Sequence, residues 1–292
     1  MRHVESAVGR DGALKSGQLA LAASWSVVCC KMGTMPTAAT GGAGFRGITP
    51  GIEFMRESFT LPRHRHRTPY ASVVLSGTLD EAGFNGRIQA RAGDVLIHPA
   101  FDSHCNSRVL TGLRLIRLNW SDRCFLSGLF QITDLDPIAI LAERDPAQAS
   151  LLLSESLGRH PVPSSNANND WPDLLAAQLR RNHVQSIGGW ARRHQLAPET
   201  VSRGFALAYG VTPQVFRAEA RALLAWQRIS AGAGALAAIA VETGFADQAH
   251  MTRWVRRISG AAPRAWRRPP PAGHSPAGCR PSAEGNRTMQ SP

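Results

Sequence analysis

Two stretches near the C-terminal end of the chain repeat one pattern of residues at a constant offset of fifty positions. The matching pairs are Val201 and Met251, Ser202 and Thr252, Arg203 and Arg253, Phe205 and Val255, Gly210 and Gly260, Pro213 and Pro263, Phe216 and Trp266, and Arg217 and Arg267. A fixed period of this length is typical of a duplicated supersecondary unit. The repeat therefore restricts this part of the chain to two equivalent units.

Each copy predicts two short helices joined by a turn. In the second copy, Met251, Val255 and Ile258 recur at i, i+4 and i+7, which is the buried face of one helix. Gly260 is placed to end that helix and Pro263 to begin another. Shorter helices are predicted upstream, over 186–195 and 235–243, before turns at 196–197 and 244–245. Both copies therefore predict a helix-turn-helix.

The exposed faces of the repeated helices are basic. Between positions 177 and 268 the chain has fourteen arginines, no lysine and four acidic residues, so most of its net charge of +12 lies there. A short basic helix that is buried on one face suits the major groove and the phosphate backbone of DNA. Paired amphipathic helices of a helical bundle, or a merely solvated basic surface, remain the alternatives at this point.

The repeat resembles a known DNA-binding domain. The run GFADQAHMTRWVRRISGAAPRAWR is similar to the second-motif signature of the AraC/XylS family of transcriptional regulators, and VSRGFALAYGVTPQVFRAEARALLA is similar to the first motif and the linking helix. The resemblance covers residues 186–267. It departs from the family pattern at Gly188, Gly189 and Gly204, and at Trp254 and Val255. Glycine within a helix is destabilising, so the first unit is expected to be the less stable one.

The linking helix, predicted from Pro213 to Ser230, would be about 27 Å long. One turn of DNA is about 34 Å, so the two recognition helices can enter successive major grooves of double-stranded promoter DNA. The outward residues expected to read bases are Glu199, Thr200, Ser202, Arg203, Gln248, Ala249, His250, Thr252 and Arg253. The residues expected to contact phosphates are Arg256, Arg257, Arg267 and Arg268. An intramolecular salt bridge is the alternative role for Arg203 or Arg253.

The pattern changes to short strands in the N-terminal half. Strands are predicted over 70–75, 86–90, 94–98 and 113–118, with glycine turns between them, which favours a sandwich or small barrel. His64-x-His66 and the run Gly93-x5-Pro99-x4-His104 resemble the two motifs of the cupin barrel, the usual effector domain of AraC/XylS regulators. The expected fold is therefore α+β with two domains: an N-terminal all-β cupin-like barrel and a C-terminal all-α tandem helix-turn-helix domain.

The cupin resemblance has two readings for the histidines. In metal-binding cupins the positions of His64, His66 and His104 hold Zn, Fe, Ni or Mn, but Tyr70 and Ala71 stand where the glutamate ligand would fall. We therefore expect no cofactor, and His64, His66, Tyr70 and His104 to line a small-molecule effector pocket. A divalent metal on the three histidines is the alternative. Cys105 is expected to be a small buried hydrophobe rather than a fourth ligand or a thiol sensor.

The expected domain organisation follows from these patterns. A disordered extension over 1–45, with Met35 or Met55 as alternative start positions, comes before the barrel at 50–122, a helical packing or dimerisation segment at 123–159 and a linker at 160–169. The DNA-binding domain is expected at 170–268, with a disordered Pro-, Gly- and Ser-rich tail at 269–292. The five cysteines show no paired spacing, which suits a reducing cytoplasm. The sequence contains no run of 18 apolar residues, so no membrane-spanning helix is predicted.

Together these observations predict a cytoplasmic, sequence-specific transcriptional regulator that responds to an effector and is not an enzyme. The family resemblance further implies RNA polymerase and a second copy of the chain as partners, no membrane association, and activation as the commoner mode. Two alternatives stay open. One is a cupin metalloenzyme of the dioxygenase or isomerase type fused to a DNA-binding module. The other is an architectural DNA binder with a sealed or side-chain-filled barrel that serves for dimerisation.

Overall fold

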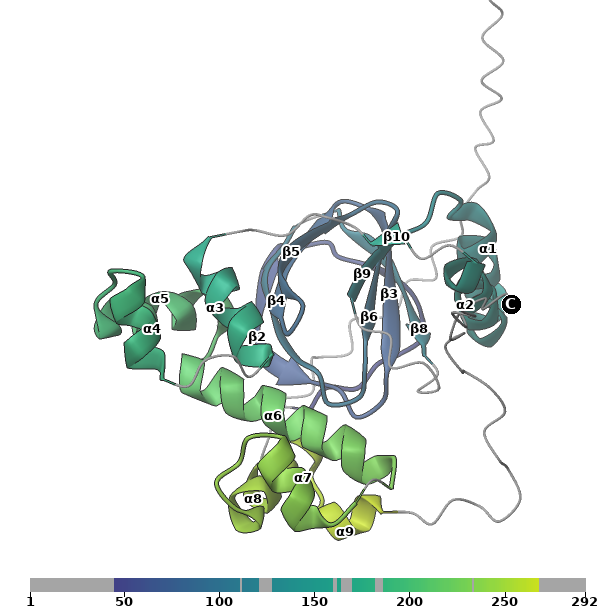
Figure 1. Ribbon diagram of the computed structural model, residues 1–292. Helices are drawn as coiled ribbons and strands as arrows, with labels where there is room; N and C mark the ends of the chain where they lie inside the picture. The colour runs from purple at the N-terminus through teal and green to yellow at the C-terminus, as the bar shows by residue number, and fades with distance from the viewer. Residues whose placement is uncertain are drawn as a thin grey trace, which may run out of the picture. The chain divides into compact units, whose positions relative to one another are not determined.

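The computed structural model describes residues 45–110, 112–120, 128–159, 162–163, 170–181, 186–232 and 234–267. The expected disordered tail, nearly all of the N-terminal extension, and all of the expected linker except Val162 and Pro163 lie outside these residues. Strands occupy the first part of the described chain and helices the second (Figure 1). None of the described helices has the length and apolar character needed to cross a lipid bilayer.

Two antiparallel sheets make up the β-domain. The larger sheet has the order β1 (Gly51–Phe54), β8 (Arg114–Asn119), β3 (Tyr70–Ser76), β6 (Asp94–His98), β9 (Gly128–Gln131) and β10 (Val162–Pro163). The smaller sheet has the order β2 (Phe59–Arg65), β7 (Ser103–Val109), β4 (Thr78–Gly83) and β5 (Gly86–Arg91). Within the described residues no ladder of hydrogen bonds joins the two sheets. The all-β, cupin-like expectation is confirmed, but the sheets form a sandwich and not the closed barrel that we expected.

The larger sheet is buried on both faces. Val73 belongs to an apolar cluster on the outer side of this sheet, whereas its neighbour Val74 belongs to the cluster between the sheets. This alternation explains the continuous apolar run in β3, because a strand covered on both faces has no solvent side. Helices α1 (Asp136–Arg144) and α2 (Pro146–Arg159) cover the outer face (Figure 1), with Ile138 and Leu153 buried against it.

The sequence pattern predicts helix over the whole segment 123–159, but only part of this segment is helical. Its described part begins with β9, which pairs with β6 and buries Leu129 and Phe130. The strand is only four residues long, too short for a period of two to be recognised. Leu153 and Leu157 are buried inside the molecule, which supports intramolecular packing for these two residues, whereas Leu151 remains 62% exposed.

The C-terminal domain begins with a helix outside the repeat, α3 (Trp171–Arg180), and continues with the helices that the repeat predicts. These are α4 (Ile187–Arg193), α5 (Pro198–Tyr209), α6 (Pro213–Ser230), α7 (Leu236–Glu242), α8 (Gln248–Ser259) and α9 (Pro263–Trp266). The two recognition helices, α5 and α8, each have 12 residues. Each ends at a left-handed glycine, Gly210 with φ 72° and Gly260 with φ 82°, as a helix C-cap commonly requires. The sequence repeat is therefore also a structural repeat.

Gly204, which interrupts the first recognition helix, has a packing role. A Cβ atom at this position would lie 2.6 Å from Cζ2 of Trp171 in α3, closer than any side chain can tolerate. The missing side chain therefore lets α5 approach the indole of α3. This contact explains a departure from the family pattern that the sequence alone presented only as a cost in helix stability.

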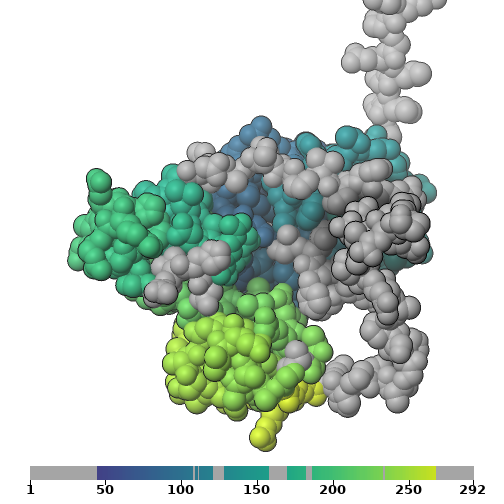
Figure 2. Space-filling view, in the orientation of Figure 1, coloured from purple at the N-terminus to yellow at the C-terminus, as the bar shows by residue number. Residues whose placement is uncertain are grey.

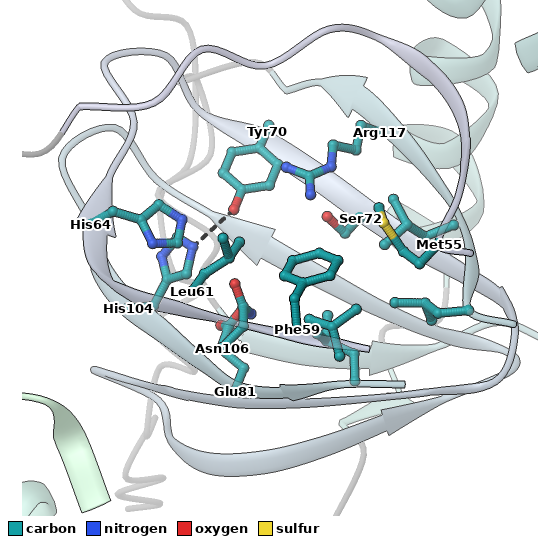
Figure 3. Close-up of a pocket in the computed structure, with 14 residues that line it drawn as sticks. Met55, Phe59, Leu61, His64, Tyr70, Ser72, Glu81, His104, Asn106 and Arg117 are labelled. Atoms are coloured by element: carbon teal, nitrogen blue, oxygen red, sulfur yellow. Dashed lines mark hydrogen bonds between the residues drawn. The ribbon is translucent and has the colours of Figure 1, made fainter. Parts of the chain in front are cut away.

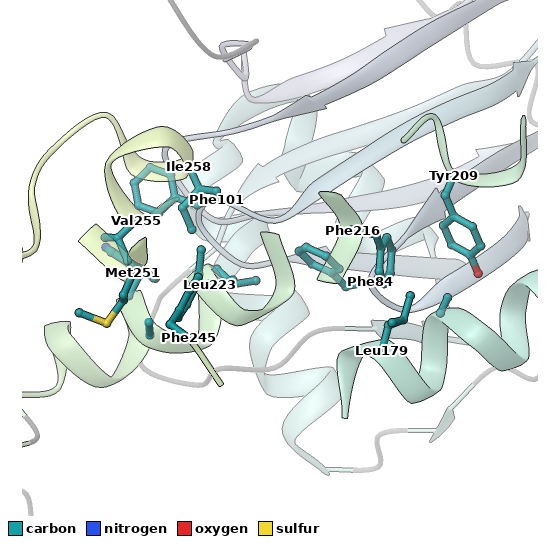
Figure 4. Packing of buried hydrophobic residues seen from close by; sticks show 14 of the residues in the cluster. Phe84, Phe101, Leu179, Tyr209, Phe216, Leu223, Phe245, Met251, Val255 and Ile258 are labelled. Atoms are coloured by element: carbon teal, nitrogen blue, oxygen red, sulfur yellow. The ribbon is translucent and has the colours of Figure 1, made fainter. Parts of the chain in front are cut away.

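One apolar cluster contains side chains from both domains (Figure 4). The ring of Phe84 lies 5.2 Å from that of Phe216 at the start of α6, and the ring of Phe101 lies 4.8 Å from that of Trp226 near its end. The ring of Phe101 also lies 5.4 Å from that of Trp266 in α9. Aromatic pairs at these separations are favourable contacts. The β-domain therefore shares a core with the helix that links the two helix-turn-helix units.

A candidate nucleic-acid interface and a buried histidine cluster

The residues predicted to read bases lie on the outer sides of the two recognition helices. Glu199, Thr200, Arg203, Gln248, Ala249 and Arg253 are exposed, and Ser202, His250 and Thr252 are partly exposed. The opposite faces are fully buried, through Val201, Phe205 and Tyr209 in α5 and through Met251, Val255 and Ile258 in α8. Because each helix buries one apolar stripe, its polar residues are left on the surface. In Figure 2 the α7 to α9 region, in yellow-green, lies at the surface of the molecule.

Arg203 and Arg253 occupy equivalent positions in the two units, and both are exposed. Neither forms an ion pair with another of the residues that the structure describes. An intramolecular salt bridge, the alternative role for these side chains, therefore has no support here. A guanidinium that is free of carboxylates keeps its planar set of donors available for a base edge or a phosphate.

The arginines predicted to contact phosphates have different settings. Arg256, Arg257 and Arg267 are exposed, whereas Arg268 lies outside the described residues. The guanidinium carbon of Arg257 lies 5.0 Å from the ring centre of Trp254, within cation–π range. The guanidinium of Arg267 donates to the carbonyl oxygen of Gly234. The last two contacts hold their side chains near the protein surface without neutralising the positive charge.

A cluster of histidines lies inside the β-domain. His64 is on β2, His66 follows that strand directly, and His104 is on β7; all three are buried. The ring centres of His64 and His104 lie 4.4 Å apart, those of His64 and His66 5.1 Å, and those of His66 and His104 5.5 Å. Their candidate ligand atoms all lie within 4.8 Å of one another. The fold thus brings together the three histidines that the cupin motifs singled out.

Two of these rings have a fixed tautomer. Nδ1 of His64 lies 2.9 Å from the carbonyl oxygen of Pro62, and Nδ1 of His66 lies 2.8 Å from that of Arg46. A carbonyl oxygen only accepts hydrogen bonds, so both Nδ1 atoms carry the hydrogen and both Nε2 atoms are left with a lone pair. Nε2 of His66 and Nδ1 of His104 are buried and have no hydrogen-bond partner among the residues that the structure describes. Metal-binding histidines in proteins typically donate their other ring N–H in this way.

Burial keeps the three histidines of the cluster uncharged. Loss of hydration lowers the pKa of His64 to about 4 and that of His66 to about 3, although each ring's bond to a backbone carbonyl partly opposes the shift. Burial and the neighbouring histidines also lower the pKa of His104 well below its usual value. At neutral pH these three imidazoles are therefore uncharged, the form in which they bind metal ions or accept hydrogen bonds.

A second group of polar side chains, His98, Asp102 and Glu81, lies beside the histidine cluster. None of these three residues was predicted to belong to the site. The ring of His98 stacks on Tyr70 with ring centres 4.6 Å apart, and its nitrogens lie 3.4 Å from Asp102 and 3.7 Å from Glu81. Burial alone would lower the pKa of His98, but the two carboxylates outweigh it and raise the pKa. His98 was visible only as the end of a predicted strand, and Glu81 lies on β4, which the sequence pattern did not predict.

The pocket at the centre of the β-domain is nearly filled by side chains (Figure 3). His64, Tyr70 and His104 line it as expected, whereas His66 is not one of its lining residues. The remaining wall consists of Met55, Phe59, Leu61, Ser72, Leu79, Glu81, Asn106, Val109, Leu113, Leu115 and Arg117. The cavity volume is about 20 Å³. That space holds one water molecule or one ion, but no organic effector of ordinary size.

Tyr70 and Cys105 complete the set of predicted residues in this region. The hydroxyl of Tyr70 is 3.2 Å from Nε2 of His104, so Tyr70 caps one side of the cluster. The thiol of Cys105 is buried, lies 3.6 Å from the carbonyl oxygen of Ala82, and its pKa is raised by burial. It is not one of the candidate metal ligands among the described residues, which form two groups: His64, His66 and His104, and Glu81, His98 and His104. Cys105 therefore has the setting of a small buried hydrophobe.

Comparisons with known proteins agree with the geometry of the C-terminal domain. Residues 190–269 match the family model described as a helix-turn-helix domain. No curated protein is similar enough to the chain to match it. Among solved structures, ToxT from Vibrio cholerae with a bound unsaturated fatty acid is 12% identical, covers 75% of this chain and 94% of its own, and has a TM-score of 0.32. A second ToxT structure from Vibrio cholerae is 9% identical to this chain. The match covers 75% of this chain and 96% of ToxT, with a TM-score of 0.32.

A variant of oxalate decarboxylase from B. subtilis is 14% identical and covers 42% of this chain and 35% of its own, with a TM-score of 0.20. Scores and identities this low carry no argument about ligand or activity. The segment that matches the family model begins within α4 and takes in both recognition helices and α9. Residues 190–269 therefore match a helix-turn-helix domain, as the sequence motifs behind the AraC/XylS resemblance predict.

Proposed function

We propose that this chain is a sequence-specific transcriptional regulator that binds double-stranded promoter DNA through α5 and α8. One observation carries the proposal: two equivalent recognition helices, joined by the single 18-residue helix α6, each present an exposed arginine without a carboxylate partner among the described residues. A link of about 27 Å is close to one turn of DNA, so both helices can enter successive major grooves on one face. The arginines concentrated in this domain add attraction for the phosphate backbone.

The roles of individual residues follow from their positions. Arg203 and Arg253 read guanine, because a guanidinium can pair with the O6 and N7 atoms together, and Gln248 at the start of α8 is placed to read adenine. Arg256, Arg257 and Arg267 contact phosphates, which fixes the register of the protein without reading sequence. In this proposal the protein acts in the cytoplasm with RNA polymerase as a partner, and activation is the commoner mode that the family resemblance implies.

Selection of a random DNA library by the full chain, at a stated salt concentration, tests this function. The wild-type protein should select a site of about 20 base pairs with two half-sites one turn apart. Arg203→Ala and Arg253→Ala should each cost about 1 to 3 kcal/mol in binding and relax one half of the site only. Arg144→Ala, which removes an exposed arginine of α1, is the control and should leave the site unchanged. Equal binding to all sequences would contradict the proposal.

The β-domain is the sensing part of the protein in this proposal. Its cavity of about 20 Å³ leaves no room for an organic molecule while the walls stay as they are. An organic effector would need the walls to move apart. A divalent transition-metal ion would not, and the histidine cluster favours it as the effector. A filled interior also suits the architectural alternative, in which the β-domain only joins two copies of the chain.

The metal alternative has a specific structural basis. His64, His66 and His104 would hold the ion, and the carbonyl oxygens of Pro62 and Arg46 already fix two of the rings with Nε2 available. A bound ion would supply a Lewis-acidic link between imidazoles, while the protein holds those rings neutral and excludes bulk water. The chain's own contribution is therefore a dry, preformed set of nitrogen donors that joins β2 to β7.

Metal binding can be tested without any DNA. The full chain, treated with chelator and titrated with Co²⁺ or Zn²⁺, should bind one ion per chain, with a cobalt absorption spectrum typical of nitrogen ligands. His104→Phe should abolish this binding, whereas His194→Ala, at an exposed position in the DNA-binding domain, should not affect it. If the wild-type protein binds no metal at micromolar concentrations, the metal alternative fails and the histidines are a polar core.

A further inference from the structure

The side chains of β2 and of the two residues that follow it face two different parts of the molecule. His64 and His66 point into the β-domain, where they meet His104. The neighbouring arginines, Arg63 and Arg65, contact the DNA-binding domain instead. Because side chains alternate along a strand, the same short run serves the interior on one side and the helices on the other.

The two arginines bind the C-terminal ends of both recognition helices. The guanidinium of Arg63 donates to the carbonyl oxygen of Tyr209, the last residue of α5, at 3.2 Å. The guanidinium of Arg65 donates to the carbonyl oxygen of Arg257, in the last turn of α8, at 3.1 Å. Carbonyl groups at the end of a helix lack partners within the helix and carry a partial negative charge, which positive side chains complement. One strand therefore caps two helices that are fifty residues apart in sequence.

Both arginines also bind one carboxylate on the helix between the two units. Nε of Arg63 lies 2.9 Å from one oxygen of Glu219, and Nη2 of Arg65 lies 2.8 Å from the other. The three side chains are only 6%, 9% and 5% exposed. Glu219 lies near the middle of α6, with α5 before that helix and α8 beyond it. The Arg63, Glu219 and Arg65 triad thus ties β2 to the link as well as to both ends.

The capping glycines make equivalent approaches to the β-domain. A Cβ atom on Gly210 would lie 3.4 Å from Cβ of Arg63, and one on Gly260 would lie 3.5 Å from a guanidinium nitrogen of Arg67. Equivalent points of the structural repeat therefore rest against residues 63–67. Contact at both ends and in the middle leaves the two recognition helices little freedom to change their separation.

We propose that β2 sets the distance between the recognition helices, and that Arg63, Arg65 and Glu219 determine which half-site spacing the protein accepts. They are positioning residues, since none of them lies on the outward faces of α5 and α8. The inference rests on the proposed function, because it needs a protein that binds two half-sites. It adds that the β-domain contributes to DNA specificity through geometry, in addition to the length of α6.

The test is the spacing profile of the full chain. The two half-sites selected from the library are placed 8, 9, 10, 11, 12 or 13 base pairs apart, centre to centre, and the affinity for each duplex is measured. The wild-type protein should prefer one spacing, near one helical turn of about 10 to 10.5 base pairs. Glu219→Gln removes the charge that holds both arginines and should reduce the preference over neighbouring spacings by about tenfold. Affinity for an isolated half-site should not change.

Two further variants separate positioning from folding. Glu242→Gln breaks the exposed pair between α7 and Arg228 of α6, which does not involve the β-domain, and should keep the wild-type profile. Arg65→Lys keeps the charge but cannot bind Glu219 and the α8 carbonyl together in the same planar geometry, so it should widen the profile by less than Glu219→Gln. Should Glu219→Gln not fold, as a thermal melt would show, Arg65→Lys decides the question.

The outcomes also distinguish the two proposals. A wild-type protein that selects no sequence contradicts the proposed function itself. A wild-type protein that selects two half-sites at one spacing, with the same profile in folded Glu219→Gln and Arg65→Lys, leaves the function standing and overturns the role of β2. A profile that widens in both variants but not in Glu242→Gln supports that role.

Discussion

The two helix-turn-helix units have the same backbone plan but different interiors. Both recognition helices have 12 residues, both end at a left-handed glycine, and both are followed by a buried proline that begins the next helix. The side chains inside differ. Phe205, Tyr209 and Phe216 of the first unit correspond to Val255, Ser259 and Trp266 of the second.

The difference is between aromatic packing and hydrogen bonding. In the first unit the ring of Phe205 stacks on Tyr209 at 4.6 Å and meets Phe216 edge-on at 5.3 Å. In the second unit the hydroxyl of Ser259 donates to the carbonyl oxygen of Val255 at 2.8 Å and accepts from the indole nitrogen of Trp266 at 2.9 Å. The two units share the residues that begin and end helices, and they fill the space between those helices in different ways.

The source of the indole beside each recognition helix also differs. In the first unit Trp171 of α3 packs against Gly204, whereas in the second the equivalent position is itself a tryptophan, Trp254. The first unit therefore depends on a helix outside the repeat, and the second has the indole within its own recognition helix. A repeat seen in sequence thus does not imply that the two copies are equally self-contained.

The largest expected effect comes from the aromatic core of the first unit. Phe205→Ala should lower the free energy of unfolding by about 3 to 5 kcal/mol, because the ring is fully buried and leaves a cavity. Val255→Ala, the matched change in the second unit, removes only two methyl groups and should cost about 2 kcal/mol. Urea unfolding of the full chain, followed by circular dichroism, measures both values. Equal losses would show that the two interiors do not differ in the way their contacts suggest.

The helical domain was largely predictable because its signals are local. Pro213 and Ser230 bound α6 as expected, since proline, glycine and the apolar period mark helix ends within a few residues. The outward positions of Arg203 and Arg253 followed from the same period. Gly204 was read as a cost because its partner, Trp171, lies more than thirty residues earlier and no local pattern connects them.

The β-domain was less predictable because its strands depend on distant partners. His64 is outside the strands that the sequence predicts, but it lies on β2, whose partner β7 begins at Ser103. The cupin motifs brought His64, His66 and His104 together, yet nothing in them pointed to Glu81 or His98. The two sheets are not joined by a hydrogen-bond ladder within the described part of the chain, and the cavity between them has a volume of about 20 Å³. Both features depend on how side chains pack in the interior, which no sequence motif records.

The contact between α3 and α5 gives a prediction of intermediate size. Gly204→Ala should destabilise the protein by about 1 to 2 kcal/mol, since the clash with Trp171 at 2.6 Å outweighs the gain in helix propensity. Gly188→Ala in α4 is the matched control, because its Cβ would meet no atom closer than 3.9 Å. That change should stabilise the unit by up to about 1 kcal/mol. Thermal unfolding measures both, and a stabilising Gly204→Ala would mean that Trp171 can move aside.

The smallest expected effect concerns the N-terminal ends of the recognition helices, where the two units differ at positions fifty residues apart. The carboxylate of Asp247 accepts a hydrogen bond from the backbone N–H of His250 at 2.6 Å, whereas Ala197 has no side chain that could do this for α5. Asp247→Ala should therefore cost about 1 kcal/mol. Ala197→Asp should gain a similar amount or slightly less, because Ala197 already has the extended backbone of a capping residue, with φ −66° and ψ 141°.

Chemical unfolding of the single and double variants measures these changes in stability. Since the two sites belong to separate units, their effects should add. A gain at position 197 without a loss at 247 would show that the β2 contacts, and not the cap, hold the second recognition helix in place.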